Sequence, residues 1–359
     1  MRQSKELILA TKPFAQERCA RSWWALGSTL VVLLILLGLT TLDIHWGIRL
    51  PCSLLASLVM VRLFVIYHDY LHGAILEHSR LADLIFTAYG LVMLTPKSIW
   101  KASHDHHHHH NGQYFGSGIG TFPLMTTDEY AKATRLERLE YVVVRHPCMM
   151  LVGYVTIFLY KMCLQELLTR PRQHLDAGAA LLLQAGMITG MAMFAPSALV
   201  FTFLVPVILS GALGTYLFYA QHNFPGARFR DEASWDYVTA ALQSSSYLRL
   251  HPIMHWFTGN IGYHHVHHLN SRIPFYRLPE AMAGIPELQS PGTTSLHPRE
   301  IYRCLRLKLW DPHQGRLVSF REFKRSCGHG SPDFHHWQTL GSLPTCVKAT
   351  GTPENVVEG

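Results

Sequence analysis

Residues 23–42 read WWALGSTLVVLLILLGLTTL, a run of twenty residues without a charged side chain. A helix of this length rises about 30 Å, which matches the hydrocarbon core of a bilayer. The whole chain agrees with this, since 48% of its residues are hydrophobic, 15% are charged and the mean hydropathy is +0.11. The sequence therefore predicts an all-α integral membrane protein rather than a soluble enzyme.

Three histidine clusters each follow an apolar run. They are His68-Asp-Tyr-Leu-His72, His104-Asp-His-His107-His108 and His264-His-Val-His267-His268. On a helix, positions i, i+3 and i+4 share one face, so the histidines of each cluster are expected to converge on one point. His222, in Ala-Gln-His-Asn-Phe, is a candidate ninth histidine. A hydrogen-bonded structural role fits a lone histidine at a helix end equally well.

Nine imidazoles are too many for one metal ion that must also react, whereas two ions that prefer octahedral coordination could share them and keep positions open for dioxygen. No protein side chain can attack an unactivated C–H bond, so such a site indicates oxidative chemistry. We predict a two-iron site with nine ligands: His68, His72, His104, His107, His108, His222, His264, His267 and His268.

The other polar residues of the clusters are predicted to lie outside the ligand set. His106, His109 and His110 are expected to point away from the metals, as outer hydrogen-bond donors or solvated residues. Asp69 and Asp105 each neighbour a ligand histidine, so each is either an acceptor that fixes an imidazole tautomer or a solvated carboxylate. The histidine run at 106–110 is not expected to be a purification tag, because tags lie at chain termini.

The clusters also constrain the membrane topology. If they share one site they lie on one side of the bilayer, so an even number of crossings must separate them. Five apolar runs follow the first one: residues 50–67, 81–95, 148–168, 177–194 and 197–220. Residues 81–95 are too short to cross, and basic side chains flank or interrupt residues 148–168, so both are predicted to lie on the membrane surface. Four transmembrane helices remain, with interfacial helices, and the three clusters are expected at one face of the membrane.

Charge sets the predicted orientation. Five basic residues precede the first span, whereas the connection at residues 43–49 is nearly neutral, so the amino terminus is expected to be cytoplasmic. The first span is expected to remain as an anchor rather than to be cleaved. We divide the chain into a cytoplasmic segment (1–22), a membrane enzyme domain (23–279) and a polar, partly disordered cytoplasmic extension (280–359), with both termini in the cytoplasm.

Charge and cysteine content exclude some other classes. The net charge of +7 is not arranged as a basic stripe with interleaved aromatic residues, so nucleic-acid binding is not expected, and the excess is attributed to contact with anionic lipid. The seven cysteines contain no C-x-x-C pair, which argues against a zinc site and a disulfide framework.

At the three clusters the sequence resembles the membrane fatty acid desaturase family, whose signature is H-x-x-x-H, H-x-x-H-H and a distant H-x-x-H-H. The segment Ser271-Arg-Ile-Pro-Phe-Tyr-Arg-Leu-Pro279 further resembles bacterial and plastid-type acyl-lipid desaturases. The resemblance covers residues 68–279. It implies four transmembrane helices beneath a cytoplasmic metal cap, in a protein of the bacterial inner membrane. It also implies two irons and dioxygen acting on a fatty acyl lipid or acyl-CoA, with His222 at the position of an additional family histidine.

The electron donor implied by the resemblance is ferredoxin or a cytochrome b5 system. His146-Pro147-Cys148 and His251-Pro252-Ile253 do not match the His-Pro-Gly-Gly motif of a fused cytochrome b5 domain, so a separate donor protein is expected. Histidine spacing alone leaves open a hydroxylase or carotenoid ketolase on the same scaffold. A metal transporter or metal-buffering protein is a further alternative, but it needs polar residues within the spans, where Arg62 is one of few.

Overall fold

The computed structural model describes residue 2, residues 4–114 and residues 120–328. Contacts divide the chain into two units, Met1–Ser319 and Phe320–Gly359. In the second unit the described part is one helix, α18 (Phe320–Gly328). The extension at residues 280–359, expected to be partly disordered, lies outside the described residues from position 329 onward.

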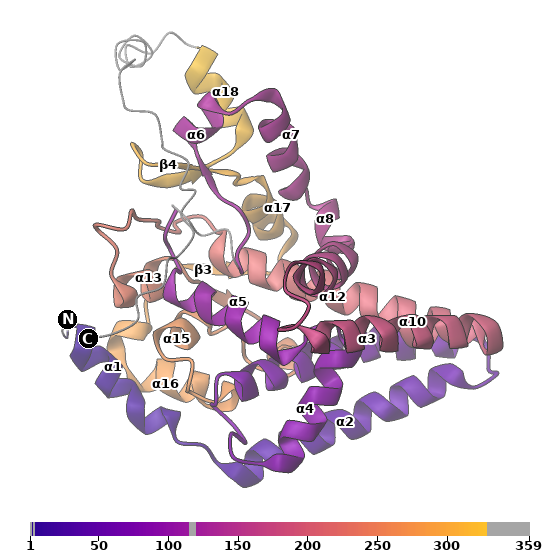
Figure 1. The fold of residues 1–359 in the computed structure, drawn as a ribbon. Helices are drawn as coiled ribbons and strands as arrows, with labels where there is room; N and C mark the ends of the chain where they lie inside the picture. The colour runs from indigo at the N-terminus through magenta and orange to yellow at the C-terminus, as the bar shows by residue number, and fades with distance from the viewer. Residues whose placement is uncertain (1, 3, 115–119, 329–359) are drawn as a thin grey trace, which may run out of the picture. The chain divides into compact units, whose positions relative to one another are not determined.

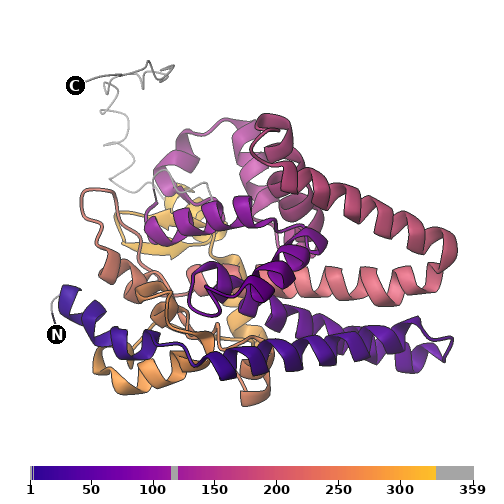
Figure 2. The ribbon, with the colours of Figure 1, turned by 60° about the horizontal axis from the view of Figure 1, so that its bottom comes forward.

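Among the described residues of the first unit, four helical segments are long and apolar enough to cross a bilayer, which confirms the predicted number. They are α2 (Cys19–Thr41), α3 (Trp46–Leu71), α10 (Leu175–Phe194) and the run Pro196–His222, which comprises α11 (Pro196–Ala198), η3 (Leu199–Leu204) and α12 (Val205–His222). They form two helical hairpins, α2 with α3 and α10 with α12, whose turns lie at the same end (Figure 1, Figure 2). Helix α3 packs against both α2 and α12.

The two runs predicted not to cross form short or interrupted helices. Helix α4 (Arg80–Val92) has 13 residues, a rise of about 20 Å, which is less than the thickness of a hydrocarbon core. Residues 148–169 are divided into α8 (Cys148–Leu151), the π-helical η2 (Tyr154–Gln165) and α9 (Glu166–Thr169). None of these segments is among the four candidate spans.

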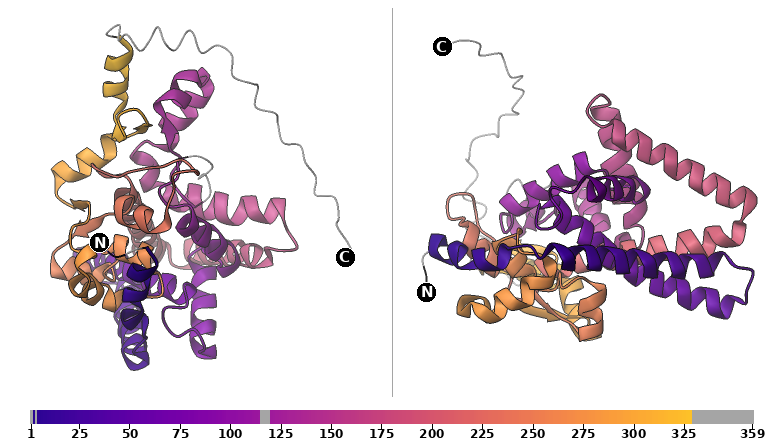
Figure 3. Two further views of the ribbon diagram at one scale, coloured as in Figure 1. Left: turned by 90° about the vertical axis from the view of Figure 1, so that its left-hand side faces the viewer. Right: turned by 90° about the horizontal axis from the view of Figure 1, so that it is seen from below.

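The remaining helices of the first unit are short, and several gather at the end of the hairpins opposite their turns (Figure 1, Figure 3). They are α1 (Ser4–Thr11), η1 (Lys12–Ala15), α5 (Lys97–His109), α6 (Thr127–Lys132), α7 (Arg135–Val144), α13 (Tyr237–Gln243), α14 (Pro252–Phe257), α15 (His264–Leu269), η4 (Phe275–Arg277), α16 (Leu278–Gly284), η5 (Pro286–Leu288) and α17 (Pro298–Arg306). Two of them, α6 and α7, begin with a capping box in which a threonine and the glutamate three residues later bond each other's backbone N–H.

Two small sheets add to the helical fold. Strands β1 (Met125–Thr126), β4 (Leu309–Asp311) and β5 (Arg316–Val318) form one, with β1 parallel and β5 antiparallel to β4. Strands β2 (Tyr247–Arg249) and β3 (Thr293–Ser295) form a parallel pair. Strands of two or three residues are too short to show the alternation of polar and apolar side chains by which a strand is recognised in sequence. Residues 280–319 thus pack within the first unit.

Candidate metal centre

The first histidine cluster lies at the end of α3. His68 is in its last turn, and His72 is the residue that caps the helix. Their spacing of four residues brings the Nε2 atoms to 3.3 Å of each other. The cluster thus lies where the second candidate span ends.

The second and third clusters lie on α5 and α15. His104, His107 and His108 are buried on α5, and His264, His267 and His268 are buried on α15. Helix α15 has six residues, too few to be stable in isolation, and it packs against α13, where Tyr237 donates a hydrogen bond to the carbonyl oxygen of His268 at 2.7 Å. Tertiary contacts therefore hold the third cluster in place.

The nine predicted histidines come together in two groups, in each of which the candidate ligand atoms lie within 4.8 Å of one another. The five-histidine group contains His68, His72, His104, His108 and His267. The four-histidine group contains His107, His222, His264 and His268. The candidate ninth histidine, His222, enters the second group from the last residue of α12.

The expectation that each H-x-x-H-H cluster converges on one point is wrong in detail. On α5, His104 and His108 belong to the five-histidine group and His107 belongs to the other. On α15 the assignment is the opposite: His264 and His268 belong to the four-histidine group, and His267 belongs to the five-histidine group. Positions i+3 and i+4 are separated by about 100° around a helix, so one helix can supply both groups.

The distances between ring nitrogens fit metal ligands better than hydrogen-bonded rings. Nε2 of His104 lies 2.9 Å from Nε2 of His68 and 3.1 Å from Nε2 of His108. Nε2 of His222 likewise lies 3.1 Å from that of His107 and 2.9 Å from that of His264. A ring nitrogen makes one well-directed hydrogen bond, not two. Two imidazole nitrogens at right angles about one metal ion are about 3.0 Å apart, so both groups fit a metal.

The protonation state of the rings agrees with this role. Burial lowers the pKa of His104, His107 and His264 well below the usual range, and neighbouring histidines lower it further. These rings are therefore neutral at pH 7, which is the form that binds a metal.

In each group, one ring is anchored by a hydrogen bond from its Nδ1 to an oxygen atom of the protein. In the five-histidine group, Nδ1 of His68 lies 3.1 Å from Oδ1 of Asp69, and in the other group Nδ1 of His222 lies 3.1 Å from the carbonyl oxygen of Ser244. By contrast, five rings bury Nδ1 without a hydrogen-bond partner among the described residues: His107, His108, His264, His267 and His268.

The two carboxylates left open by the sequence have different roles. Asp69 is 1% exposed, and its second oxygen accepts a hydrogen bond of 2.5 Å from the backbone N–H of Phe275. Asp105 is half-buried, with 39% of its side chain exposed, and it pairs with Lys101 at 2.6 Å. Asp69 is therefore the acceptor that fixes a ring, whereas Asp105 is a solvated carboxylate.

The histidines predicted to point away from the metals belong to neither group. His109 is exposed and its Nδ1 lies 2.7 Å from the carbonyl oxygen of Asp105. The rings of His106 and His110 stack on each other, with centroids 3.9 Å apart.

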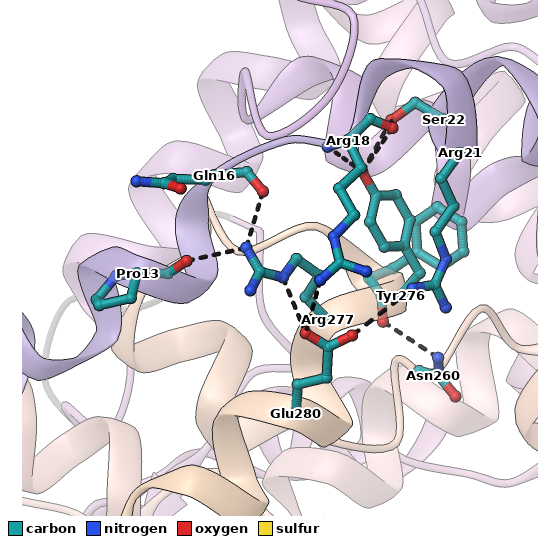
Figure 4. Close-up of polar contacts among 10 residues, drawn as sticks. Pro13, Gln16, Arg18, Arg21, Ser22, Asn260, Tyr276, Arg277 and Glu280 are labelled. Atoms are coloured by element: carbon teal, nitrogen blue, oxygen red, sulfur yellow. Dashed lines mark hydrogen bonds and ion pairs between the residues drawn. The ribbon is translucent and has the colours of Figure 1, made fainter.

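The N-terminal segment holds the loop that contains Phe275 (Figure 4). The hydroxyl of Tyr276 accepts a hydrogen bond of 2.9 Å from the backbone N–H of Arg18, and Arg277 donates to the carbonyl oxygens of Pro13 and Gln16 at 2.9 and 3.0 Å. Residues 13–18 thereby support the loop from which Phe275 binds Asp69. Nothing in the sequence indicates this support.

A cleft enclosing about 480 Å³, part of it open to solvent, reaches the four-histidine group. Its walls include His107 and His222 together with the rings of Phe122, Phe218 and Phe229. The other polar side chains in the cleft include Arg145 and Asn223, which neither cluster spacing nor charge pattern singled out.

Two comparisons with known proteins agree with this geometry. The family model described as Fatty acid desaturase matches residues 44–298, which include all nine histidines. The chain is also similar to a protein named "Fatty acid desaturase" from Bacillus subtilis (strain 168), with 30% identity over 351 residues that cover 94% of this chain and 97% of the relative.

Proposed function

This chain belongs to the fatty acid desaturase family, and from that premise we propose that it is an oxygen-dependent, di-iron membrane enzyme that introduces a double bond into a fatty acyl chain. The observation that carries the proposal is the division of nine histidines, seven of them buried and two half-buried, into two adjacent sets of five and four, each with the nitrogen spacing of a metal site. Family membership alone does not assign these nine side chains.

In this proposal the five-histidine group holds one iron and the four-histidine group holds the other. Iron, when bound, supplies with dioxygen the oxidising power that breaking an unactivated C–H bond requires. Neutral imidazoles suit iron because they add no negative charge to the site. The four-histidine group supplies fewer ligands, so an iron ion held there would have more positions free for a co-substrate.

The reaction converts CH₂–CH₂ to CH=CH. Dioxygen accepts two hydrogens from the acyl chain, together with two electrons and two protons from outside, and leaves as two molecules of water. The electrons come from a separate protein, ferredoxin or cytochrome b5, since neither His-Pro motif of the chain matches that of a fused cytochrome b5 domain.

The protein's part is to hold the acyl chain and exclude water. The histidine groups lie at one end of two spanning hairpins, so an acyl lipid or acyl-CoA reaches them without its chain leaving an apolar environment. On the charge rule this end is cytoplasmic, as are both termini. The resemblance to bacterial acyl-lipid desaturases supports the inner membrane of a bacterium as the location.

The test is the fatty-acid profile of a heterologous host that expresses the chain. Gas chromatography with mass spectrometry should find a new double bond, absent from cells that express His268→Ala at equal membrane level. Hydroxylated lipid or ketocarotenoid in place of that product would mean that the chain is a hydroxylase or a carotenoid ketolase on the same scaffold. Metal efflux or storage without a lipid change would indicate a transporter or buffer.

A further inference from the structure

His222 lies at a position where a helix by itself directs a side chain poorly. It is the last residue of α12, and Asn223 after it leaves the helical conformation with φ of −121° and ψ of 71°. Helix ends fray, because their last carbonyl groups have no partner within the helix. Yet the Nε2 atom of His222 must lie close to those of His107 and His264 for the four-histidine group to form.

The side chain of Asn223 fastens this helix end to distant parts of the chain. It is 4% exposed, and its Oδ1 accepts a hydrogen bond of 2.7 Å from Arg145. Its Nδ2 donates to the carbonyl oxygens of Cys304 at 2.8 Å and Leu307 at 3.1 Å, and to the hydroxyl of Tyr219 at 3.0 Å. Arginine is a donor only, so its contact fixes which atom of the amide is the oxygen.

Arg145 is a costly residue in this place. It follows α7 and is 2% exposed, yet its described contacts include no carboxylate. Its guanidinium donates to Asn223 and to the carbonyl oxygens of Pro123 and Leu307, and it lies 5.0 Å from the centre of the Tyr219 ring. Burying a charge without a counter-ion is unfavourable, and oriented carbonyls and a ring face compensate for it in part. These contacts hold the guanidinium in one position, from which it donates to Asn223.

The anchors come from a part of the chain that contributes no histidine to either group. Cys304 and Leu307 belong to α17 and the connection to β4, and Figure 1 shows α17 beside the C-terminal end of α12. The five-histidine group takes its rings from α3, α5 and α15 and has none from α12. A change at Asn223 should therefore reach one group and leave the other.

We propose that Asn223, bonded to Arg145 and to the α17–β4 connection, is a positioning residue that holds His222 in the four-histidine group. The C-terminal segment, defined as α17 and its connection to β4 (residues 298–308), is therefore needed for binding of one of the two metals. This inference rests on the proposed function, in which each group holds an iron. Outer hydrogen bonds of this kind change metal affinity by about 10- to 100-fold in other proteins.

The experiment is an anaerobic titration of the purified, detergent-solubilised full chain with Fe²⁺, with bound iron measured by mass spectrometry. The unaltered protein should bind two irons per chain. Asn223→Ala should keep one iron at unchanged affinity and bind the second about 10- to 100-fold more weakly. Leu26→Ala is the matched control for lost stability, since it opens a cavity at a 1% exposed site in α2, a helix without a ligand.

A double variant identifies the group that is affected. His264→Ala removes a ligand of the four-histidine group, so adding Asn223→Ala to it should not weaken the iron that remains. Should Asn223→Ala fail to fold, Tyr219→Phe replaces it, because it keeps the ring and removes the hydroxyl that accepts from Asn223 and donates to the carbonyl oxygen of Leu307. Its second iron should bind about 3- to 10-fold more weakly, since these hydrogen bonds are lost while the others of Asn223 remain.

The outcomes are separable. Two irons at unchanged affinity in Asn223→Ala, or the same single loss in Leu26→Ala, would overturn the positioning role. A further loss in the double variant would do the same. If the unaltered protein binds no iron, the proposed function itself is at fault.

Discussion

The two histidine groups differ in how their anchored rings are held. In the five-histidine group the anchor is Asp69, the residue next to His68 on the same helix. In the four-histidine group the Nδ1 partner of His222 is the carbonyl oxygen of Ser244, and the helix end is fastened by Asn223 to residues more than 80 positions away. One anchor is thus a neighbouring carboxylate on the same helix, and the other is a set of bonds across the fold, one of them from the guanidinium of Arg145.

This difference implies different sensitivities. A carboxylate that accepts from an imidazole N–H makes the ring a stronger ligand as well as orienting it, whereas the bonds of Asn223 hold a helix end and only orient the ring. We expect the metal affinity of the five-histidine group to depend mainly on Asp69 itself. The metal affinity of the four-histidine group should depend mainly on docking of the C-terminal segment against Asn223.

The largest effects should come from removing a ligand from either group. His72→Ala and His107→Ala, one in each group, should both reduce desaturated product below detection, because the reaction needs both metals. Each purified variant should lose about one iron per chain and still appear in the membrane fraction at normal level. Turnover by either variant would exclude that residue from the ligand set and weaken the two-group description.

The next effect sharpens the comparison at its charged anchor. Asp69→Asn keeps the shape but replaces the carboxylate with a neutral amide, so we expect activity and one iron affinity to fall by about 10- to 100-fold. Asp105→Asn is the matched control, because this partly exposed carboxylate also follows a ligand histidine but pairs with Lys101. Equal losses in the two variants would contradict the distinct role of Asp69.

The sequence predicts much of the fold and of the site because the signals for both are local. Apolar length marked the four spans, and the i, i+3, i+4 spacing marked the histidines on α5 and α15. The requirement for an even number of crossings excluded α4 as a span without any coordinates. These features depend on a few consecutive residues and on bilayer thickness.

What the sequence could not predict depends on distant contacts. The exchange of His107 and His267 between the groups follows from how α5 and α15 face each other. Asn223 stood next to a candidate ligand, but its partner Arg145 reads as one more basic residue beside a surface helix. The short strand β4, which follows Leu307, has no signal of its own in the sequence.

A smaller effect tests the support beneath the charged anchor. Tyr276→Phe removes the hydroxyl that bonds the backbone of Arg18 and lies 3.1 Å from Oγ of Ser22 (Figure 4). We expect the free energy of unfolding to fall by about 1 kcal/mol, because the hydrogen bonds of this hydroxyl are lost while Phe fills the same space. Differential scanning fluorimetry in detergent would measure it, and both irons should still bind. A selective loss of one iron would mean that the N-terminal segment tunes the metal directly.

The smallest effect concerns the segment that contacts Asn223. Lys308 donates a hydrogen bond of 2.5 Å to the carbonyl oxygen of Arg145, and burial, with the charge of Arg145 adding to it, lowers the pKa of Lys308 to about 8. The ring of Tyr219 also lies 5.7 Å from its Nζ. In the unfolded chain the lysine keeps its ordinary pKa of about 10.4. Between these two values the unfolded state binds more protons than the folded state, so the contribution of Lys308 to stability rises with pH in that window and is unfavourable below it.

A step from pH 7.5 to pH 8.5 should therefore stabilise the protein through Lys308 by less than about 0.7 kcal/mol, or about 1 °C in melting temperature. Lys308→Met keeps the length of the side chain and cannot titrate, so the difference between the two melting curves isolates this lysine from all other groups. The variant should be the more stable protein at pH 7 and should lose that advantage toward pH 10. A difference that stays constant across this range would show that Lys308 is solvated, and that the segment holding Asn223 is less tightly docked than the segment holding Phe275.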